Sequence, residues 1–452
     1  IISAIRHLSF YPFVQALARN RRQWRLEAAP GDLTACELVC WKRSEPEVLF
    51  RTSLLPGLED GQRQQWTGET VFTGETHYIK YGFWLEDQAG NRRWLNDRGL
   101  FTDMQESGSF ELLQVNETDI FAVPAWAQGC IYYQIFPERF ARRGPAGAGM
   151  DDWNAAPTRD NVLGGNLGGI IDRIPYLSEL GVECLYLNPI FTGDFNHKYA
   201  TTDYFSVDPM FGTKDTLRKL VARCHEAGIR VILDGVFNHS GIHFPPFEDL
   251  LKNGEESRYR GWFYPKRFPI EIDPACYECV GDYPYMPRLN GANGEVRAYV
   301  RDVLLYWLRE AGIDGWRFDV ADELDRHAVI WWREEIKREF PQAVLLGETW
   351  GDASWLLGAD GFDTAMNYLF RDAVTDCLAR GRIGVSELSR RLNSALMKVT
   401  GPNGHAMYNC LGSHDTARFL TEAKGEAWRL RLAMALQMLF PGAPAIYYGD
   451  EL

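Results

Sequence analysis

The distribution of hydrophobic and polar positions divides the chain into two regions with different periodicity. In residues 1–118, short segments rich in β-branched and aromatic residues alternate with turn signals such as Pro56-Gly57. Short strands at this spacing are typical of a β-sandwich. We therefore predict an N-terminal all-β sandwich over residues 1–118 and a linker over residues 119–129. The predicted strands are Gln23–Ala28, Ala35–Lys42, Glu47–Leu55, His77–Glu86 and Ser109–Val115.

From residue 130 onward, brief apolar runs alternate with segments of helical periodicity. Leu217, Leu220, Val221 and Cys224 recur at helical spacing ahead of Gly228. Alternating strands and helices imply parallel βαβ units, and eight of them predict an α/β fold, a (β/α)8 TIM barrel over residues 130–452. The predicted strands are Ile131–Phe136, Cys184–Leu187, Val231–Leu233, Gly315–Phe318, Val344–Leu346, Phe362–Met366, Met407–Cys410 and Ala445–Tyr448.

Residues 240–290 interrupt this alternation. The segment is rich in proline and aromatic residues and has no helical or strand periodicity. It is too long for an ordinary connecting loop. We predict an inserted subdomain after the third barrel strand.

Charge and cysteine content narrow the class of protein. The chain has 48 basic and 61 acidic residues, a formal net charge of −13. This surplus argues against binding to nucleic acid or to an anionic membrane. No run of about 20 apolar residues indicates a membrane span. The first residues do not resemble a signal peptide, and nine scattered cysteines favour reduced thiols, so we expect a cytoplasmic location.

Candidate chemistry is concentrated where the predicted barrel strands end. Carboxylates, an arginine and two histidines follow or end four of these strands, and the carboxyl ends of barrel strands form the active site in this fold. A pair of carboxylates beside a sugar is the equipment of glycoside hydrolysis, since one stabilises positive charge and one donates a proton. These residues are Asp234, His239, Arg317, Asp319, Glu348, His414 and Asp415.

No motif indicates a cofactor or a metal. The chain lacks a glycine-rich phosphate loop, an HExxH zinc helix and a G-x-S-x-G nucleophile elbow. Cys276 and Cys279 have no second ligand pair at zinc-binding spacing, so we interpret them as structural thiols.

Four strings around these residues resemble the signature regions of the α-amylase family, glycoside hydrolase family 13. A further string, MPRLN, resembles the extra signature of the branch that contains neopullulanases, cyclomaltodextrinases and maltogenic amylases. The N-terminal region is similar to starch-binding modules of carbohydrate-binding module family 34. The four strings are DGVFNH (Asp234–His239), GWRFDVADE (Gly315–Glu323), GETW (Gly347–Trp350) and GSHDTARF (Gly412–Phe419).

The resemblance implies catalytic roles for three carboxylates. Asp319 would be the nucleophile, Glu348 the general acid/base and Asp415 the carboxylate that grips the sugar hydroxyls. Arg317 would orient Asp319 and lower its pKa.

The resemblance also implies a set of substrate-binding residues. His239 and His414 would hydrogen-bond the sugar in the cleaved subsite, and Tyr204 would stack on its ring. Trp350 and Glu323 would line the leaving-group side.

The implied activity is retaining hydrolysis of α-1,4-glucosidic bonds in cyclodextrins, short maltodextrins or pullulan. Alternatives are a transglycosylase or α-1,6-glucosidase of the same family, and a catalytically silent glucan-binding scaffold. The resemblance further implies a homodimer. Relatives often have a calcium loop where Ala141–Gly147 offers no carboxylate, so we expect no calcium there. Because the chain ends after the eighth predicted strand, we expect it to lack the eighth helix and the C-terminal domain of relatives.

Overall fold

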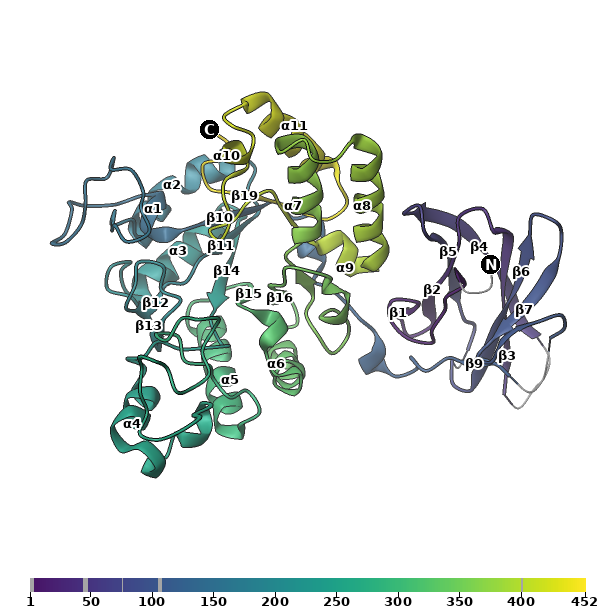
Figure 1. The fold of residues 1–452 in the computed structure, drawn as a ribbon, viewed down its shortest axis with the longest axis horizontal. Helices are drawn as coiled ribbons and strands as arrows, with labels where there is room; N and C mark the ends of the chain where they lie inside the picture. The colour runs from purple at the N-terminus through teal and green to yellow at the C-terminus, as the bar shows by residue number, and fades with distance from the viewer. Residues whose placement is uncertain (1–3, 44–47, 75, 105–107, 400) are drawn as a thin grey trace. The chain divides into compact units, whose positions relative to one another are not determined.

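The computed structural model describes residues 4–43, 48–74, 76–104, 108–399 and 401–452. The chain divides into two compact units (Figure 1). The first, called the β-unit, comprises residues 1–122, 372–377 and 381–404. The second, called the barrel unit, comprises residues 123–371, 378–380 and 405–452.

Over its described residues, the β-unit has nine strands that form two layers. The strand order is β1-β2-β5-β4-β3-β6-β7-β8, with β9 paired to β6. The long strand β4 pairs with β3 through one part and with β5 through another, and so links the layers. This architecture confirms the predicted all-β sandwich. The strands are β1 (Val14–Ala18), β2 (Arg21–Ala28), β3 (Leu33–Lys42), β4 (Val48–Glu59), β5 (Gln64–Val71), β6 (Ile79–Asp87), β7 (Arg92–Asn96), β8 (Gly99–Phe101) and β9 (Phe110–Glu111).

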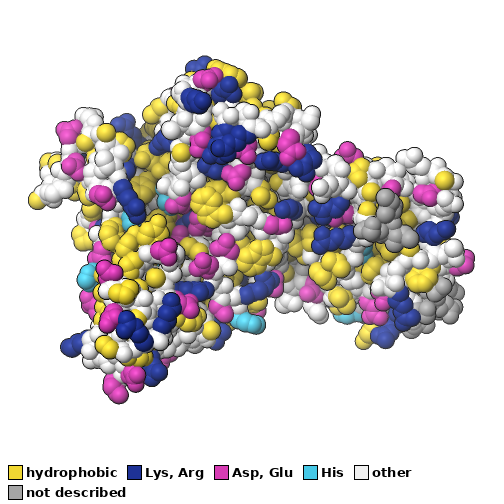
Figure 2. Space-filling view, in the orientation of Figure 1, with side chains coloured by type: hydrophobic (Ala, Val, Ile, Leu, Met, Phe, Trp, Pro, Cys, Tyr) yellow, Lys and Arg dark blue, Asp and Glu magenta, His cyan; other side chains and the backbone are white. Residues whose placement is uncertain are grey.

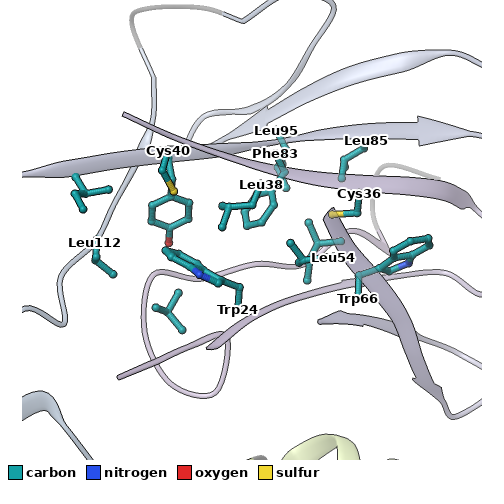
Figure 3. Packing of buried hydrophobic residues seen from close by; sticks show 14 of the residues in the cluster. Trp24, Cys36, Leu38, Cys40, Leu54, Trp66, Phe83, Leu85, Leu95 and Leu112 are labelled. Atoms are coloured by element: carbon teal, nitrogen blue, oxygen red, sulfur yellow. The ribbon is translucent and has the colours of Figure 1, made fainter. Parts of the chain in front are cut away.

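Five of these strands correspond to predicted ones, with Glu47 of the predicted third strand outside the described residues. The core between the layers consists of alternate residues, as the two-residue period of a strand requires. Cys36, Leu38 and Cys40 of β3 face Trp24 and the other inward side chains of this core (Figure 3).

One helix belongs to the β-unit although its residues lie far along the chain. Helix α8 (Val385–Lys398) packs against β4. The Gln65 amide donates to the Met397 carbonyl at 3.1 Å, and the Asn393 amide donates to the Glu59 carbonyl at 2.9 Å. The sequence analysis had placed this segment within residues 130–452.

The barrel unit contains eight parallel strands in the order β17-β16-β15-β14-β11-β10-β19-β18. A parallel bridge between Met366 and Tyr408 connects the two ends of this order. The structure therefore confirms the predicted (β/α)8 barrel, and each strand overlaps a predicted apolar run. The strands are β10 (Tyr132–Ile135), β11 (Cys184–Leu187), β14 (Arg230–Gly235), β15 (Gly315–Phe318), β16 (Val344–Gly347), β17 (Thr364–Ala365), β18 (Tyr408–Cys410) and β19 (Ala443–Tyr447).

Helices surround these strands (Figure 1). Helix α3 buries the four apolar residues whose spacing predicted it, and Thr213 caps its first turn. Among the described residues, no helix combines the length and apolarity needed to cross a membrane. The helices that lie wholly in the barrel unit are α1 (Pro137–Phe140), α2 (Leu167–Glu179), α3 (Lys214–Glu226), α4 (Pro245–Asn253), α5 (Gly294–Glu310), α6 (Arg326–Glu339), α10 (Phe419–Glu422) and α11 (Ala427–Leu439), whereas α7 (Tyr368–Val374) and α9 (Gly401–Ala406) each have residues in both units.

Two segments project from the barrel strands. The hairpin of β12 (Phe191–Gly193) and β13 (Thr201–Val207) follows β11, and residues 240–290 follow β14. The second segment contains α4 and a set of isolated antiparallel bridges, including one between Cys279 and Pro287. Charged side chains of both signs are interspersed over the visible face (Figure 2).

Candidate active site

Parallel pairing of β14, β15 and β16 brings the predicted site residues to one end of the barrel. Asp234 is opposite Arg317 in the register of β14 and β15, and Arg317 is opposite Leu346 of β16. Asp319 and Glu348 each follow directly after the end of their strand. The same edge therefore presents all of these side chains.

Arg317 is the centre of this arrangement. Its side chain is completely buried, and its guanidinium nitrogens lie 2.8 Å from Asp234 Oδ1, 2.7 Å from Asp319 Oδ1 and 2.7 Å from Glu348 Oε2. One positive charge therefore faces three carboxylates whose side chains are almost fully buried. A planar guanidinium can hold several carboxylates at defined angles, which an ammonium cannot.

A pocket of about 590 Å³ opens above this cluster. The three carboxylates predicted to be catalytic, Asp319, Glu348 and Asp415, all line it. So do His239, His414 and Trp350. The structure thus brings six of the nine predicted site residues onto the wall of one cavity, with Arg317 directly beneath them.

Burial and charge determine the protonation of the carboxylates. Burial raises the pKa of Asp319 above its usual range, and Arg317 opposes this effect. Arg317 thus lowers the pKa of Asp319, as the sequence analysis expected, but burial raises this pKa by more. Burial and the charge of Glu348 raise the pKa of Asp415 to about 6. A cluster with more carboxylates than cations retains protons up to a higher pH than isolated aspartates do.

The two pocket histidines that were predicted to bind substrate, His239 and His414, are neutral near pH 7. Burial lowers the pKa of His239 to about 3 and that of His414 to about 4. His239 Nε2 lies 3.9 Å from Asp319 Oδ2, and His414 Nε2 lies 3.1 Å from Asp415 Oδ2. Neutral imidazoles in these places can hydrogen-bond a neutral sugar without adding charge.

The tyrosine predicted to stack on the sugar does not face the pocket, whereas a neighbouring tyrosine does. Tyr204 is only 1% exposed and does not line the pocket. It lies within β13, where its ring stacks on Phe237 and its hydroxyl donates to the His239 carbonyl at 2.8 Å. Tyr199, in the turn before this strand, lines the pocket and stacks on His414 at an interplanar angle of 3°. The position of Tyr199 in a loop could have indicated its role from the sequence, because loops carry functional side chains more often than strand interiors do.

The residues predicted for the leaving-group side lie in two places. Trp350 lines the pocket and is 49% exposed. Its ring stacks on that of Tyr368, with the ring centroids 4.1 Å apart, and this contact fixes the orientation of the indole. Glu323 instead lines a neighbouring hollow of about 330 Å³, where its carboxylate accepts from the Asn238 amide at 3.2 Å. Glu323 is therefore not on the wall of the main pocket.

The inserted segment, residues 240–290, forms one wall of the pocket. The sequence analysis predicted the segment but none of its pocket residues. Tyr285 packs on Phe195 of the hairpin loop, with ring centroids 4.7 Å apart. Arg159 also lines the pocket and was not predicted. The insertion contributes the pocket residues Val280, Tyr283, Tyr285 and Met286.

This geometry supports acid/base and nucleophilic chemistry on a neutral polyhydroxylated ligand. The pocket combines carboxylates held by one cation, neutral imidazole donors and exposed aromatic rings that suit a sugar face.

Comparisons with known proteins agree with this geometry. A family model described as the alpha amylase catalytic domain matches residues 134–452. Another, described as the alpha amylase N-terminal ig-like domain, matches residues 1–116.

Individual relatives match over the full chain. Neopullulanase 2 of Thermoactinomyces vulgaris is 40% identical over 463 residues, covering 100% of this chain and 78% of that protein. A cyclomaltodextrinase of Thermoanaerobacter pseudethanolicus is 42% identical over 467 residues, covering 100% of this chain and 80% of that protein. A solved cyclomaltodextrinase structure superposes with a TM-score of 0.93 at 39% identity, covering 100% of this chain and 78% of that chain.

Proposed function

The chain belongs to the α-amylase family, and from that premise we propose that it is a retaining glycoside hydrolase of α-1,4-glucosidic bonds. The observation that carries the proposal is the set of three carboxylates on one pocket wall, two of them paired with the same buried guanidinium. A silent glucan-binding scaffold would not need this set, whose burial destabilises the fold.

The proposed reaction is a double displacement. Glu348 donates a proton to the glycosidic oxygen while an oxygen of Asp319 bonds to the anomeric carbon and the aglycone leaves. Glu348 then removes a proton from water, which attacks the same carbon and releases Asp319. Arg317 holds both carboxylates throughout, since it contacts each at 2.7 Å.

Other pocket residues would bind the sugar in the cleaved subsite. Asp415 would accept hydrogen bonds from its hydroxyls, and the neutral His239 and His414 would donate to them. Tyr199, rather than Tyr204, would stack on the ring. Trp350 would contact the sugar on the leaving-group side.

We infer that short or cyclic glucans are better substrates than a polymer. The inserted segment forms one wall of the pocket through Tyr283 and Tyr285, and a wall there would restrict the approach of a long chain to Asp319. Relatives named neopullulanase and cyclomaltodextrinase support cyclodextrins, short maltodextrins and pullulan as candidates.

One experiment tests both bond class and stereochemistry. The enzyme is incubated with γ-cyclodextrin, maltotriose, pullulan and starch, and fresh products are followed by proton NMR. We expect the α-anomer first, because two inversions restore the configuration, and a higher kcat/KM for γ-cyclodextrin than for starch. First release of the β-anomer would remove Asp319 as nucleophile. Products longer than the substrate would favour the transglycosylase alternative, and preferential cleavage of α-1,6 bonds the α-1,6-glucosidase.

Location and assembly complete the proposal. Buried thiols such as Cys36, Cys184 and Cys224 are typical of a reducing compartment, which supports a cytoplasmic enzyme. We also propose a homodimer, on the resemblance to the neopullulanase branch. Sedimentation of the full chain at micromolar concentration should show a dimer, and a monomer would contradict this.

A further inference from the structure

His414 is held from both sides by groups whose hydrogen-bonding roles are defined. On one side, Gln134 Nε2 lies 3.0 Å and Asn188 Nδ2 lies 3.1 Å from His414 Nδ1. Amide nitrogens can only donate, so Nδ1 must be unprotonated, with its single lone pair shared between the two donors. A hydrogen on Nδ1 would face two other donors.

The other ring nitrogen has the opposite environment. His414 Nε2 lies 3.1 Å from Asp415 Oδ2 and 2.6 Å from the Tyr199 hydroxyl. The Tyr199 hydroxyl donates its own hydrogen to Asp234 Oδ2 at 2.8 Å, so it presents a lone pair to the imidazole. Both neighbours require a hydrogen on Nε2, and this evidence is independent of the amides.

The orientation of the two amides is set from Tyr199. Its hydroxyl gives its hydrogen to Asp234 and therefore accepts from Asn188 Nδ2 at 2.9 Å. Asn188 Oδ1 then accepts from Gln134 Nε2 at 3.1 Å, and the 3.4 Å contact of Gln134 Oε1 with the Tyr408 hydroxyl is not needed for this assignment. The Gln134 and Asn188 side chains are almost completely buried, at 0% and 1% exposure, and neither lines the pocket. They therefore cannot bind substrate directly.

We propose that Gln134 and Asn188 are positioning residues that fix His414 as the neutral tautomer with its hydrogen on Nε2. Resting on the proposed function, this inference assigns the Nε2 hydrogen as the one that His414 directs toward the Tyr199 hydroxyl and Asp415 in the free enzyme and can share with a sugar hydroxyl when substrate binds. The wrong tautomer would place a lone pair against the Asp415 carboxylate and leave the sugar without a donor. The proton position in this imidazole is thus determined by residues from the ends of β10 and β11, outside the pocket.

The first test is direct observation of the imidazole. Protein labelled with ¹⁵N-histidine is studied without substrate near neutral pH, and the His414 signals are assigned by their loss in His414→Gln. We expect a protonated Nε2 and a bare Nδ1. A hydrogen on Nδ1, or rapid exchange between both tautomers, would overturn the proposal.

The second test removes one amide donor. In Gln134→Met, the neutral imidazole loses a hydrogen bond that stabilised it, so the pKa of His414 should rise above its wild-type value of about 4. The kcat/KM should fall about tenfold, the size expected for the loss of one intramolecular hydrogen bond. Tyr408→Phe is the matched control, because it removes only the hydroxyl that contacts Gln134, and it should change neither quantity appreciably.

The outcomes separate this inference from the proposed function. If His414 titrates identically in wild type and Gln134→Met, the two amides do not control it and the inference fails, whatever the enzyme hydrolyses. If the spectrum shows the expected tautomer but no glucan is cleaved, the proposed function fails while the tautomer assignment stands. The wild-type spectrum decides the question even if Gln134→Met does not fold.

Discussion

Arg317→Lys tests whether one guanidinium holds the carboxylate cluster together. Lysine keeps the positive charge but offers a single nitrogen in place of the two guanidinium nitrogens that contact the carboxylates. Asp234 and Asp319 contact the same guanidinium nitrogen, whereas Glu348 contacts the other. An ammonium near the first position would leave Glu348 buried without its cation.

The expected cost follows from this loss. Removing one partner of a buried ion pair destabilises by about 3–5 kcal/mol, and because the charge is retained we expect about 3 kcal/mol. At about 2 °C per kcal/mol for a unit of this size, Tm should fall by about 6 °C. The kcat should fall as well, because Asp319 and Glu348 lose their common anchor.

The destabilisation should depend on pH with a defined sign. Glu348 without its cation repels Asp319 more strongly, so the folded-state pKa of Asp319, which burial and the charge of Glu348 already raise, rises further above its unfolded value. Proton uptake then favours the folded variant at low pH, so the Tm deficit should be largest near about pH 8 and smaller near about pH 5.

The matched control is Arg333→Lys. Arg333 is also buried and pairs with Asp363 at 2.8 Å, but Lys337 pairs with the same carboxylate at 2.6 Å and remains. This variant should lose less stability and retain kcat. Calorimetry and steady-state kinetics measure both effects. An equal Tm loss in the two variants, or a loss in Arg317→Lys that is the same at both pH values, would refute the reasoning.

Three further predictions concern mechanism, pH and metal. Glu348→Gln should lower kcat about 10²–10⁴-fold with KM little changed, as expected for loss of a general acid, and Asp319→Asn should yield no covalent intermediate by mass spectrometry; retained activity in either contradicts its role. Because the pKa of Asp415 is raised to about 6 and the anion is required, kcat/KM should decline below about pH 6 by up to about tenfold per unit, and a plateau down to about pH 5 would contradict this. EDTA should leave Tm unchanged, since Arg142 already donates to the Leu163 carbonyl at 3.1 Å in the loop where a calcium ion would need oxygen ligands; a lower Tm that calcium restores would show the opposite.

The local pattern of hydrophobic and polar residues was sufficient to predict the architecture and to place Asp319 and Glu348 at one edge of the barrel. A two-residue period over residues 1–118 and alternating strand and helix patterns afterwards specify a sandwich and a barrel, because each pattern buries its apolar face in only one way. Since all barrel strands run parallel, Asp319 and Glu348 had to reach the same edge once their strands were recognised. No tertiary information was needed for that step.

Strand β5 was missed because its sequence, QQWTGETV, is mostly polar. It is nevertheless paired on both sides, with β2 and β4, and contributes Trp66 to the core. Likewise, the amphipathic pattern of α8 predicts a helix but does not say which surface it packs against. In both cases the structure depends on contacts with segments that are remote in sequence, since β5 pairs with β2 and β4 and α8 packs on β4.

The site shows the same division. Tyr199 and Tyr204 are equivalent as residue types five positions apart, and only the tertiary structure shows that β13 buries one ring against Phe237 while the turn before it directs the other into the pocket. The tautomer of His414 depends on Gln134 and Asn188, which are 280 and 226 residues away in the chain. Composition and periodicity specify which face of an element is buried, because that depends on neighbours along the chain. The direction of a side chain and the position of a proton depend on neighbours in space, and these exist only after the barrel has closed.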